Sequence, residues 1–338
     1  MARQQRIDLI REIEKHRKSR VICCLTSDRQ NAQGVIAKDF LPVFFEHLRK
    51  FDDQKRVDVL MVTPGGDTLA AFGLSRLLRE FSNWIGTLAP EKCQSAGTLF
   101  ALGANEIFMG RAATLTPIDP SITTLLNPIA EAAPGQRQIL PISVESVAGF
   151  KTLVKEDWRL NDEAAGAAFR ILAEKINPLA LGDVYRSRQQ IERLARVLLS
   201  NHRKDERQIH TIVETLTRGL GSHDYLISRA EARDLLGKQM AKDDPKLETL
   251  TWELFTDYRD YMELGTLFDA GMVVHAAMGA GKSLPILDEQ KVVVIESAEA
   301  GDEFERVMQL ALGQTMTPVG PVQSVQAGVV RAGWKHYK

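Results

Sequence analysis

The chain has almost no excess of charge of either sign, since 43 lysines and arginines are balanced by 44 aspartates and glutamates. Such a balance predicts no basic surface for nucleic acid and no attraction to an anionic membrane. Cysteine is also scarce. Cys23, Cys24 and Cys93 are odd in number and two are adjacent, so no disulfide framework is expected. We therefore expect a reduced, cytoplasmic protein that does not bind nucleic acid.

Long apolar segments are missing as well. No run approaches the roughly 18 apolar residues of a membrane span. Residues 1–20 are charged throughout and lack the apolar centre of a signal peptide. The sequence therefore predicts no membrane span in this chain.

Short β-rich runs alternate with helical segments in the N-terminal part of the chain. We expect strands at residues 20–26, 57–63, 84–89 and 106–109, and helices at 39–49, 68–81 and 95–104. This alternation is typical of an α/β protein with a largely parallel sheet.

The remaining residues give a less regular pattern. We expect an irregular loop at 123–140, a long helical region at 143–177 and a helix at 181–202. In the C-terminal part we expect helices at 250–264 and 302–312 and strands at 272–275 and 291–295.

Ser95 stands where the strand at 84–89 leads into a run of small and apolar residues that is typical of a buried helix. A serine at that position is often an N-cap, whose hydroxyl accepts from the free N–H groups of the first helical turn. The other interpretation is a nucleophile. The residues around Ser95 alone do not decide between the two.

A second motif, Pro64-Gly65-Gly66, follows the strand at 57–63 and precedes a helix. Two glycines leave backbone N–H groups accessible to a ligand because no Cβ blocks the approach. Such donors form an oxyanion hole when they point to a carbonyl oxygen on which negative charge develops. We therefore interpret Gly65, Gly66 and Ala96 as candidates for an oxyanion hole.

Three segments, Pro64-Gly65-Gly66, Ser95-Ala96-Gly97-Thr98 and Ile118-Asp119-Pro120-Ser121, together resemble the Clp-fold serine peptidases of the crotonase-like superfamily. Within that branch the match is closest to the serine dehydrogenase proteinase family. The resemblance implies a crotonase/Clp-protease-like ββα superhelix with helical C-terminal additions. The resemblance covers a catalytic domain at about 20–240 and leaves a C-terminal subdomain or extension at 241–338. We expect a helix at 1–19, because the apolar residues of this charged segment lie on one helical face, namely Ile7, Leu9, Ile10 and Ile13.

The resemblance implies a serine endopeptidase that acts on proteins or peptides and assembles from identical subunits, with no metal or other cofactor. It leaves any ATPase partner open. In the proteolytic subunit of Clp protease the base is a histidine, but this chain has Asp119 at the matching place. A Ser-His-Asp triad therefore cannot be carried over, and we expect Asp119 to order its loop.

Relatives that resemble signal peptide peptidase A use a Ser-Lys dyad instead. Lys151 matches the place of that lysine, and it lies among apolar residues. Desolvation lowers the pKa of a lysine and allows it to act as a base. Lys155 is one turn further on, and His223 beside Asp224 is the second candidate. The sequence therefore predicts Ser95 as nucleophile with Lys151, Lys155 or His223 as base.

Two other classes of function remain open. A crotonase-like acyl-CoA enzyme uses the same paired amides with a carboxylate, for which Asp67 lies close to the glycines. The absence of the catalytic histidine would also fit an inactive scaffold that binds peptides.

A nucleotide site is not expected. Residues 278–283 resemble the end of a phosphate-binding loop, but Ala276 replaces the first glycine and Leu284-Pro285 follows where a helix is needed.

Overall fold

A computed structural model describes residues 3–51, 55–118, 121–122, 126–133, 136–140, 142–317 and 320–337. The chain forms two compact units. The first contains Met1–Leu115 and Ser228–Lys338, and the second contains Thr116–Ile227. The boundaries of the three predicted regions, near residues 20 and 240, stay predictions.

Strands of the first unit form a mixed sheet in the order β11-β10-β9-β1-β2-β3-β4. β1 to β4 are parallel, and β9 to β11 are added in antiparallel fashion. Their bounds are β1 Arg20–Thr26, β2 Arg56–Val62, β3 Trp84–Ala89, β4 Glu106–Met109, β9 Ile286–Glu296, β10 Gly301–Thr317 and β11 Gly320–Tyr337. The predicted α/β class is confirmed, and so is the largely parallel N-terminal part of the sheet.

The helices of the first unit connect and cover these strands. They are α1 Arg3–Arg17, α2 Phe40–Leu48, α3 Thr68–Phe81, α4 Ala96–Leu102, α9 Arg229–Leu236, α10 Pro245–Tyr261 and α11 Ala270–Gly279. The helices predicted at 39–49, 68–81, 95–104 and 250–264 are therefore confirmed, with small differences at their ends.

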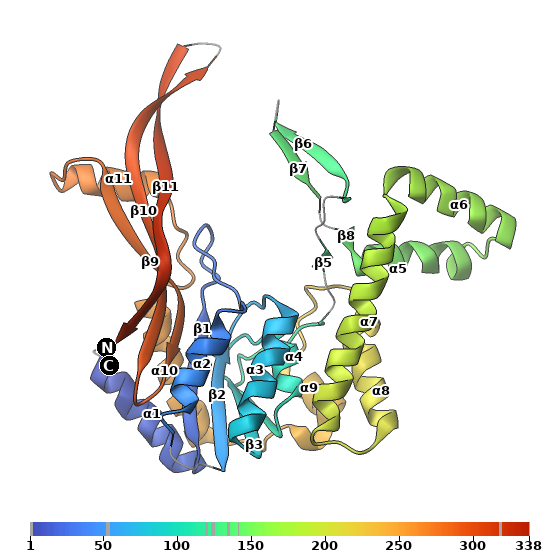
Figure 1. Cartoon of the computed structure of the whole chain (residues 1–338), viewed down its shortest axis with the longest axis horizontal. Helices are drawn as coiled ribbons and strands as arrows, with labels where there is room; N and C mark the ends of the chain where they lie inside the picture. The colour runs from blue at the N-terminus through green and yellow to red at the C-terminus, as the bar shows by residue number, and fades with distance from the viewer. Residues whose placement is uncertain are drawn as a thin grey trace. The chain divides into compact units, whose positions relative to one another are not determined.

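One face of the sheet is buried under α1 and α10. Ile10 and Ile13 of α1 pack in one cluster with Leu254 of α10 and with Val21 and Leu25 of β1. Side chains alternate between the two faces of a strand. Ile22 and Cys24 therefore point to the opposite face, on the side where Figure 1 shows α2 and α3. The sheet is thus the middle layer of the unit.

The C-terminal part corrects two predictions. Residues 272–275 are helical and lie in α11, where Asp269 caps the helix by accepting from the Met272 N–H. Residues 302–312 lie in β10, which pairs with β9 on one side and β11 on the other. Figure 1 shows β10 and β11 continuing past β9 as a two-stranded ribbon. The C-terminal addition is therefore helical only in α10 and α11.

The second unit is mainly helical in its described residues. Its elements are β5 Ser121–Ile122, β6 Ile129–Ala133, β7 Gln136–Ile139, β8 Ile142–Ser143, α5 Val144–Thr152, α6 Asp162–Lys175, α7 Pro178–Ser200 and α8 Glu206–Glu214, with π-helical turns at Leu153–Asp157 and Thr215–Gly219. The predicted helix at 181–202 is confirmed as α7. The predicted loop at 123–140 contains the β6–β7 pair, and the helical region at 143–177 is interrupted between α5 and α6.

Candidate active site

Ser95 lies at a sharp turn directly before α4. Its backbone has φ 51° and ψ −111°, and its hydroxyl makes no capping hydrogen bond to the helix. The N-cap interpretation is therefore wrong. A left-handed φ in a non-glycine residue is strained and persists only where the surroundings impose it. A serine at a strained turn into a helix is the arrangement of a nucleophile elbow.

Thr63, directly after β2, forms backbone hydrogen bonds with the segment before Ser95. The Thr63 N–H donates to the Lys92 carbonyl at 2.9 Å, and the Gln94 N–H donates to the Thr63 carbonyl at 3.0 Å. A Cβ added to Gly97 in α4 would lie 2.6 Å from Thr63 Cγ2. The first turn of α4 therefore packs so closely on Thr63 that only glycine fits at position 97.

The structure brings the glycine turn against Ser95. Gly65 has φ +125°, and a Cβ there would lie 2.8 Å from Ser95 Cβ and 3.2 Å from Ser95 Oγ. Gly66 has φ +143°, and a Cβ there would lie 2.4 Å from the Ile36 carbonyl oxygen. Both positions thus need glycine for conformation and for space. The two motifs read separately from the sequence form one site.

The three amides predicted for an oxyanion hole differ in their hydrogen bonds. The Gly65 N–H donates to Thr63 Oγ1 at 3.0 Å. Within the described residues, the N–H groups of Gly66 and Ala96 donate no hydrogen bond. An N–H at the first position of a helix has no acceptor within the helix. The N–H groups of Gly66 and Ala96 are therefore available to donate to a ligand oxygen. Gly65 instead leaves room for the Ser95 side chain.

Two reactive side chains near Ser95 are unsuited to catalysis. Burial raises the pKa of the Cys93 thiol to about 12, so the sulfur is a neutral thiol and a weak nucleophile. Burial acts to lower the pKa of Lys92, but hydrogen bonds and charges of Asp28 and Glu91 raise it overall. Lys92 therefore stays protonated and cannot take a proton from Ser95.

Asp67 is engaged as a helix cap. Its carboxylate accepts from the Leu69 N–H at 2.8 Å and from the Ala70 N–H at 3.1 Å. A cap of this kind stabilises the start of α3. The carboxylate considered for a crotonase-like reaction therefore has a structural role.

The candidate bases lie in the second unit, whereas Ser95 lies in the first. Lys151 is exposed near the end of α5 and lines a pocket of about 560 Å³ whose walls include Phe169 and Leu181. Lys155 pairs with Asp162 at 2.6 Å. His223 is half-buried in the turn before α9. The choice of base stays a prediction.

Asp119 lies outside the described residues. The role predicted for it, ordering of its loop, also stays a prediction.

A buried, hydrogen-bonded Ser-His-Asp cluster elsewhere in the first unit was not anticipated from the sequence. His47 Nδ1 lies 2.8 Å from Ser297 Oγ, and His47 Nε2 lies 2.8 Å from Asp302 Oδ2. Ser297 and His47 are both fully buried, at 0% exposure. A substrate cannot reach that serine, so this hydrogen-bonded cluster is a structural connection between α2 and the β9–β10 turn.

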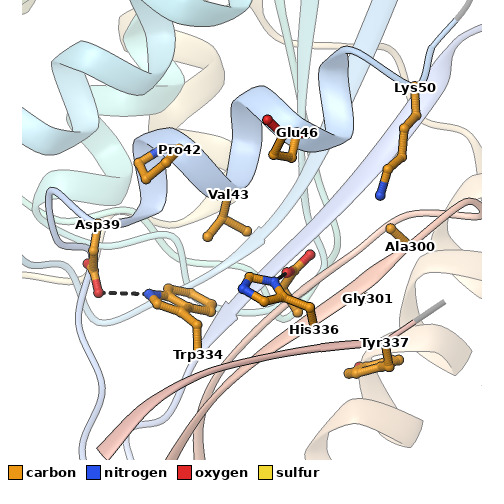
Figure 2. Close-up of a pocket in the computed structure, with 11 residues that line it drawn as sticks. Asp39, Pro42, Val43, Glu46, Lys50, Ala300, Gly301, Trp334, His336 and Tyr337 are labelled. Carbon is orange, nitrogen blue, oxygen red and sulfur yellow. Dashed lines mark hydrogen bonds and ion pairs between the residues drawn. The ribbon is translucent and has the colours of Figure 1, made fainter.

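The neighbouring pocket, of about 630 Å³, is drawn in Figure 2. Trp334 and His336 of β11 line the wall opposite Val43 of α2, and the Trp334 indole donates to Asp39 at 2.9 Å. The pocket lining contains Asp302 but neither Ser297 nor His47. It therefore gives no access to the buried serine.

The carboxylate in this cluster predicts a pH dependence of stability. Burial acts to raise the pKa of Asp302, but hydrogen bonds from His47 and His336 outweigh it and hold that pKa below its ordinary value of 3.8. Stabilisation by Asp302 is therefore present above that value and is lost as pH falls through the folded-state pKa. We expect Asp302→Asn to lower the free energy of unfolding by about 1.5–3 kcal/mol at neutral pH.

Urea unfolding of the full chain checks this prediction. The difference between Asp302→Asn and the unchanged protein should shrink from neutral pH to an acidic pH below the folded-state pKa of Asp302, where both side chains are uncharged. Asp234→Asn, at an exposed position, is the control and should leave the midpoint unchanged. If Asp302→Asn lowers the free energy of unfolding equally at both pH values, the ionised Asp302 carboxylate is not the source of the stabilisation.

The segment that resembles a phosphate-binding loop begins in the last turn of α11, and the next regular element after it is β9. It therefore lacks the helix N-terminus that binds a phosphate, as predicted. Among the described residues, no group of three potential metal-ligating side chains occurs. None of the described helices has the length and apolarity needed to cross a membrane.

The first unit is thus a mixed α/β unit with a serine at a strained turn and a glycine turn packed against it. Residues 1–134 match the family model of ClpP-like SDH-type serine proteinases. The predicted resemblance to this family is confirmed over that stretch. The relationship to the wider crotonase-like superfamily stays a prediction.

Two uncharacterized proteins of Methanocaldococcus jannaschii are similar to this chain. One is 26% identical over 239 residues, which cover 68% of this chain and 70% of the relative. The other is 26% identical over 241 residues, which cover 68% and 71%.

Two solved structures of mutants of the 1510-N membrane-bound stomatin-specific protease also match, one of them in complex with a substrate peptide. The first has 13% identity and a TM-score of 0.39, covering 69% of this chain and 84% of the other. The second has 13% identity and a TM-score of 0.38, covering 68% and 77%. Scores this low carry no conclusion about the site.

Proposed function

We propose that the protein is a serine endopeptidase that hydrolyses proteins or peptides with Ser95 as nucleophile. The observation that supports this most is the position of Ser95: its backbone is strained, its hydroxyl does not cap α4, and Gly65 leaves space beside its side chain. A strained backbone at a non-glycine residue is typical of a functional position. The family match of residues 1–134 supports the same reaction class.

In the proposed reaction, Ser95 Oγ bonds to the carbonyl carbon of the peptide while its proton passes to the base. The amides of Gly66 and Ala96 donate to the oxygen that becomes negative. The carbon–nitrogen bond then breaks, and the amine leaves with the proton from the base. Water attacks the acyl-enzyme, which releases the acid and restores the serine. No cofactor takes part in this scheme.

Lys151 is the proposed base, with Lys155 and His223 as alternatives. A lysine accepts a proton only as the neutral amine, and removal from water favours that form. Because Lys151 is exposed in the single chain, the proposal requires that substrate or a second subunit covers it. Assembly from identical subunits in the cytoplasm is part of this proposal.

Labelling with a fluorophosphonate probe, followed by intact mass spectrometry, tests the nucleophile. We expect one probe adduct on the unchanged protein and on Ser283→Ala, which alters an exposed serine, and none on Ser95→Ala. The adduct depends on an activated serine, because an ordinary hydroxyl is a poor nucleophile. Absence of labelling on the unchanged protein would favour an inactive scaffold.

The same assay discriminates the three candidate bases. Lys151→Ala is expected to lower the labelling rate by about 100-fold or more, since general-base catalysis contributes a factor of this size. Lys155→Ala and His223→Ala should label at the normal rate. If His223→Ala alone abolishes labelling, the base is the histidine and the dyad is wrong.

A further inference from the structure

The hydroxyl of Thr63 is fully engaged beside the glycine turn. It accepts from the Thr26 hydroxyl at 2.8 Å and from the Gly65 N–H at 3.0 Å, and it donates to the Gly65 carbonyl at 3.2 Å. A threonine hydroxyl has one donor and two acceptor sites. All three are in use, and Thr63 is 0% exposed. The hydroxyl therefore has a single orientation.

These hydrogen bonds determine the orientation of the peptide group between Gly65 and Gly66. Its carbonyl accepts from Thr63 and also from the Ile36 N–H at 2.9 Å. In a planar trans peptide the N–H points away from the C=O. The Gly66 N–H is therefore directed away from Ile36.

The next amide of the turn is held by the same residue, Ile36. The Asp67 N–H donates to the Ile36 carbonyl at 2.8 Å. Gly66 thus lies between two restrained neighbours, which limits rotation of its N–H.

Thr63 also contacts the other half of the site. Its main chain holds the segment before Ser95 through Lys92 and Gln94. Its methyl group lies where a Cβ on Gly97 would be 2.6 Å away. One buried side chain therefore contacts both the turn that carries the Gly66 amide and the helix that begins with Ala96.

We propose that Thr63 is a positioning residue for the oxyanion hole. Its hydroxyl accepts from the Gly65 N–H and donates to the Gly65 carbonyl. These bonds hold the Gly65–Gly66 peptide so that the Gly66 N–H is available to the substrate oxygen. This rests on the proposed function of Ser95. Thr63 touches no substrate atom and acts through Gly66.

The test compares rates of fluorophosphonate labelling in variants of the full chain. Thr63→Val keeps the shape and the methyl contact but removes the hydroxyl. We expect the maximal labelling rate to fall by about 10- to 100-fold, because a displaced oxyanion donor loses most of its effect. The probe concentration at half-maximal rate should stay within about threefold, since probe binding before the reaction does not use this amide.

Two further variants separate positioning from general packing. Thr63→Ser keeps the hydroxyl and should label within about threefold of the unchanged protein. Thr251→Val removes a hydroxyl that is equally buried, at 1% exposure, but that donates to the Leu247 carbonyl within α10 at 2.8 Å. It should also label within about threefold. If Thr63→Val does not fold, Thr63→Ala replaces it with the same expectation.

The outcomes distinguish this inference from the proposed function. If the unchanged protein is labelled at Ser95 and Thr63→Val reacts at the same rate, positioning by Thr63 is refuted while the nucleophile stands. Equal losses in Thr63→Val, Thr63→Ser and Thr251→Val would also refute it, since only packing would then be affected. If the unchanged protein is not labelled, the proposed function itself fails.

Discussion

Replacement of Gly65 by alanine is expected to lower the rate of fluorophosphonate labelling of Ser95 by about 100-fold or more, since a displacement of about 1 Å at a reacting group has an effect of this size. The added methyl group would lie 2.8 Å from Ser95 Cβ and 3.2 Å from Ser95 Oγ. Ser95 has little freedom to move because its turn is held by Thr63 and followed directly by α4.

Gly281→Ala is the matched control for this substitution. Gly281 also has a left-handed φ, +73°, but nothing lies within 4 Å of an added Cβ. Its replacement carries the conformational penalty of about 1–2 kcal/mol without a steric clash. We expect normal labelling of Gly281→Ala. Equal loss of labelling in both variants would show that backbone strain, rather than the contact with Ser95, causes the effect.

The second large effect concerns stability. Arg6 of α1 is 2% exposed. Its guanidinium bonds to Glu296 at 2.9 Å and to Asp257 at 3.1 Å, and it lies 4.4 Å from the ring centroid of Tyr261. Burial acts to lower the pKa of Arg6, but the charge and hydrogen bonds of its partners raise it overall. The guanidinium is therefore charged and links α1, α10 and β9.

Arg6→Ala is expected to lower the free energy of unfolding by about 3–5 kcal/mol, because the buried Asp257 loses the guanidinium that pairs with it. Among the described residues, the buried Glu296 then keeps only Arg3, at 2.8 Å, as a positively charged partner. Urea unfolding followed by circular dichroism measures the effect. Arg49→Ala is the control, since Arg49 pairs with Glu46 at 3.4 Å and both side chains are 59% exposed. A pair of this kind contributes at most about 1 kcal/mol. Similar losses in both variants would contradict the role of burial.

The sequence predicted elements well where the local pattern and the tertiary environment agree. β1, β3 and β4 are apolar runs that lie in the sheet, and α3 begins at a capping aspartate. β10 is the opposite case. Its residues 302–312 are rich in glutamate, leucine and methionine, which favour a helix. Pairing with β9 and β11 on both sides overrides that local preference.

The candidate site was partly predictable for the same reason. Ser95 and Gly65-Gly66 are recognisable because their chemistry needs particular residues at local turns. Thr63 and His47 carry no such local signal. Their roles depend on partners from other segments, as with Thr26 for Thr63 and Asp302 for His47. A signal was present only in the position of Thr63 directly before Pro64-Gly65-Gly66.

The sequence by itself determined the α/β class, the parallel β1–β4 part and the positions of the Ser95 and Pro64-Gly65-Gly66 motifs, because these follow from short-range pattern and backbone geometry. Only the tertiary structure decided that Ser95 does not cap α4, that Gly65 packs against it and that Arg6 is buried on a nominally polar helix. Each of these depends on which distant segments meet. Hydrogen bonding and burial between such segments are properties of the folded chain and not of any short stretch of it.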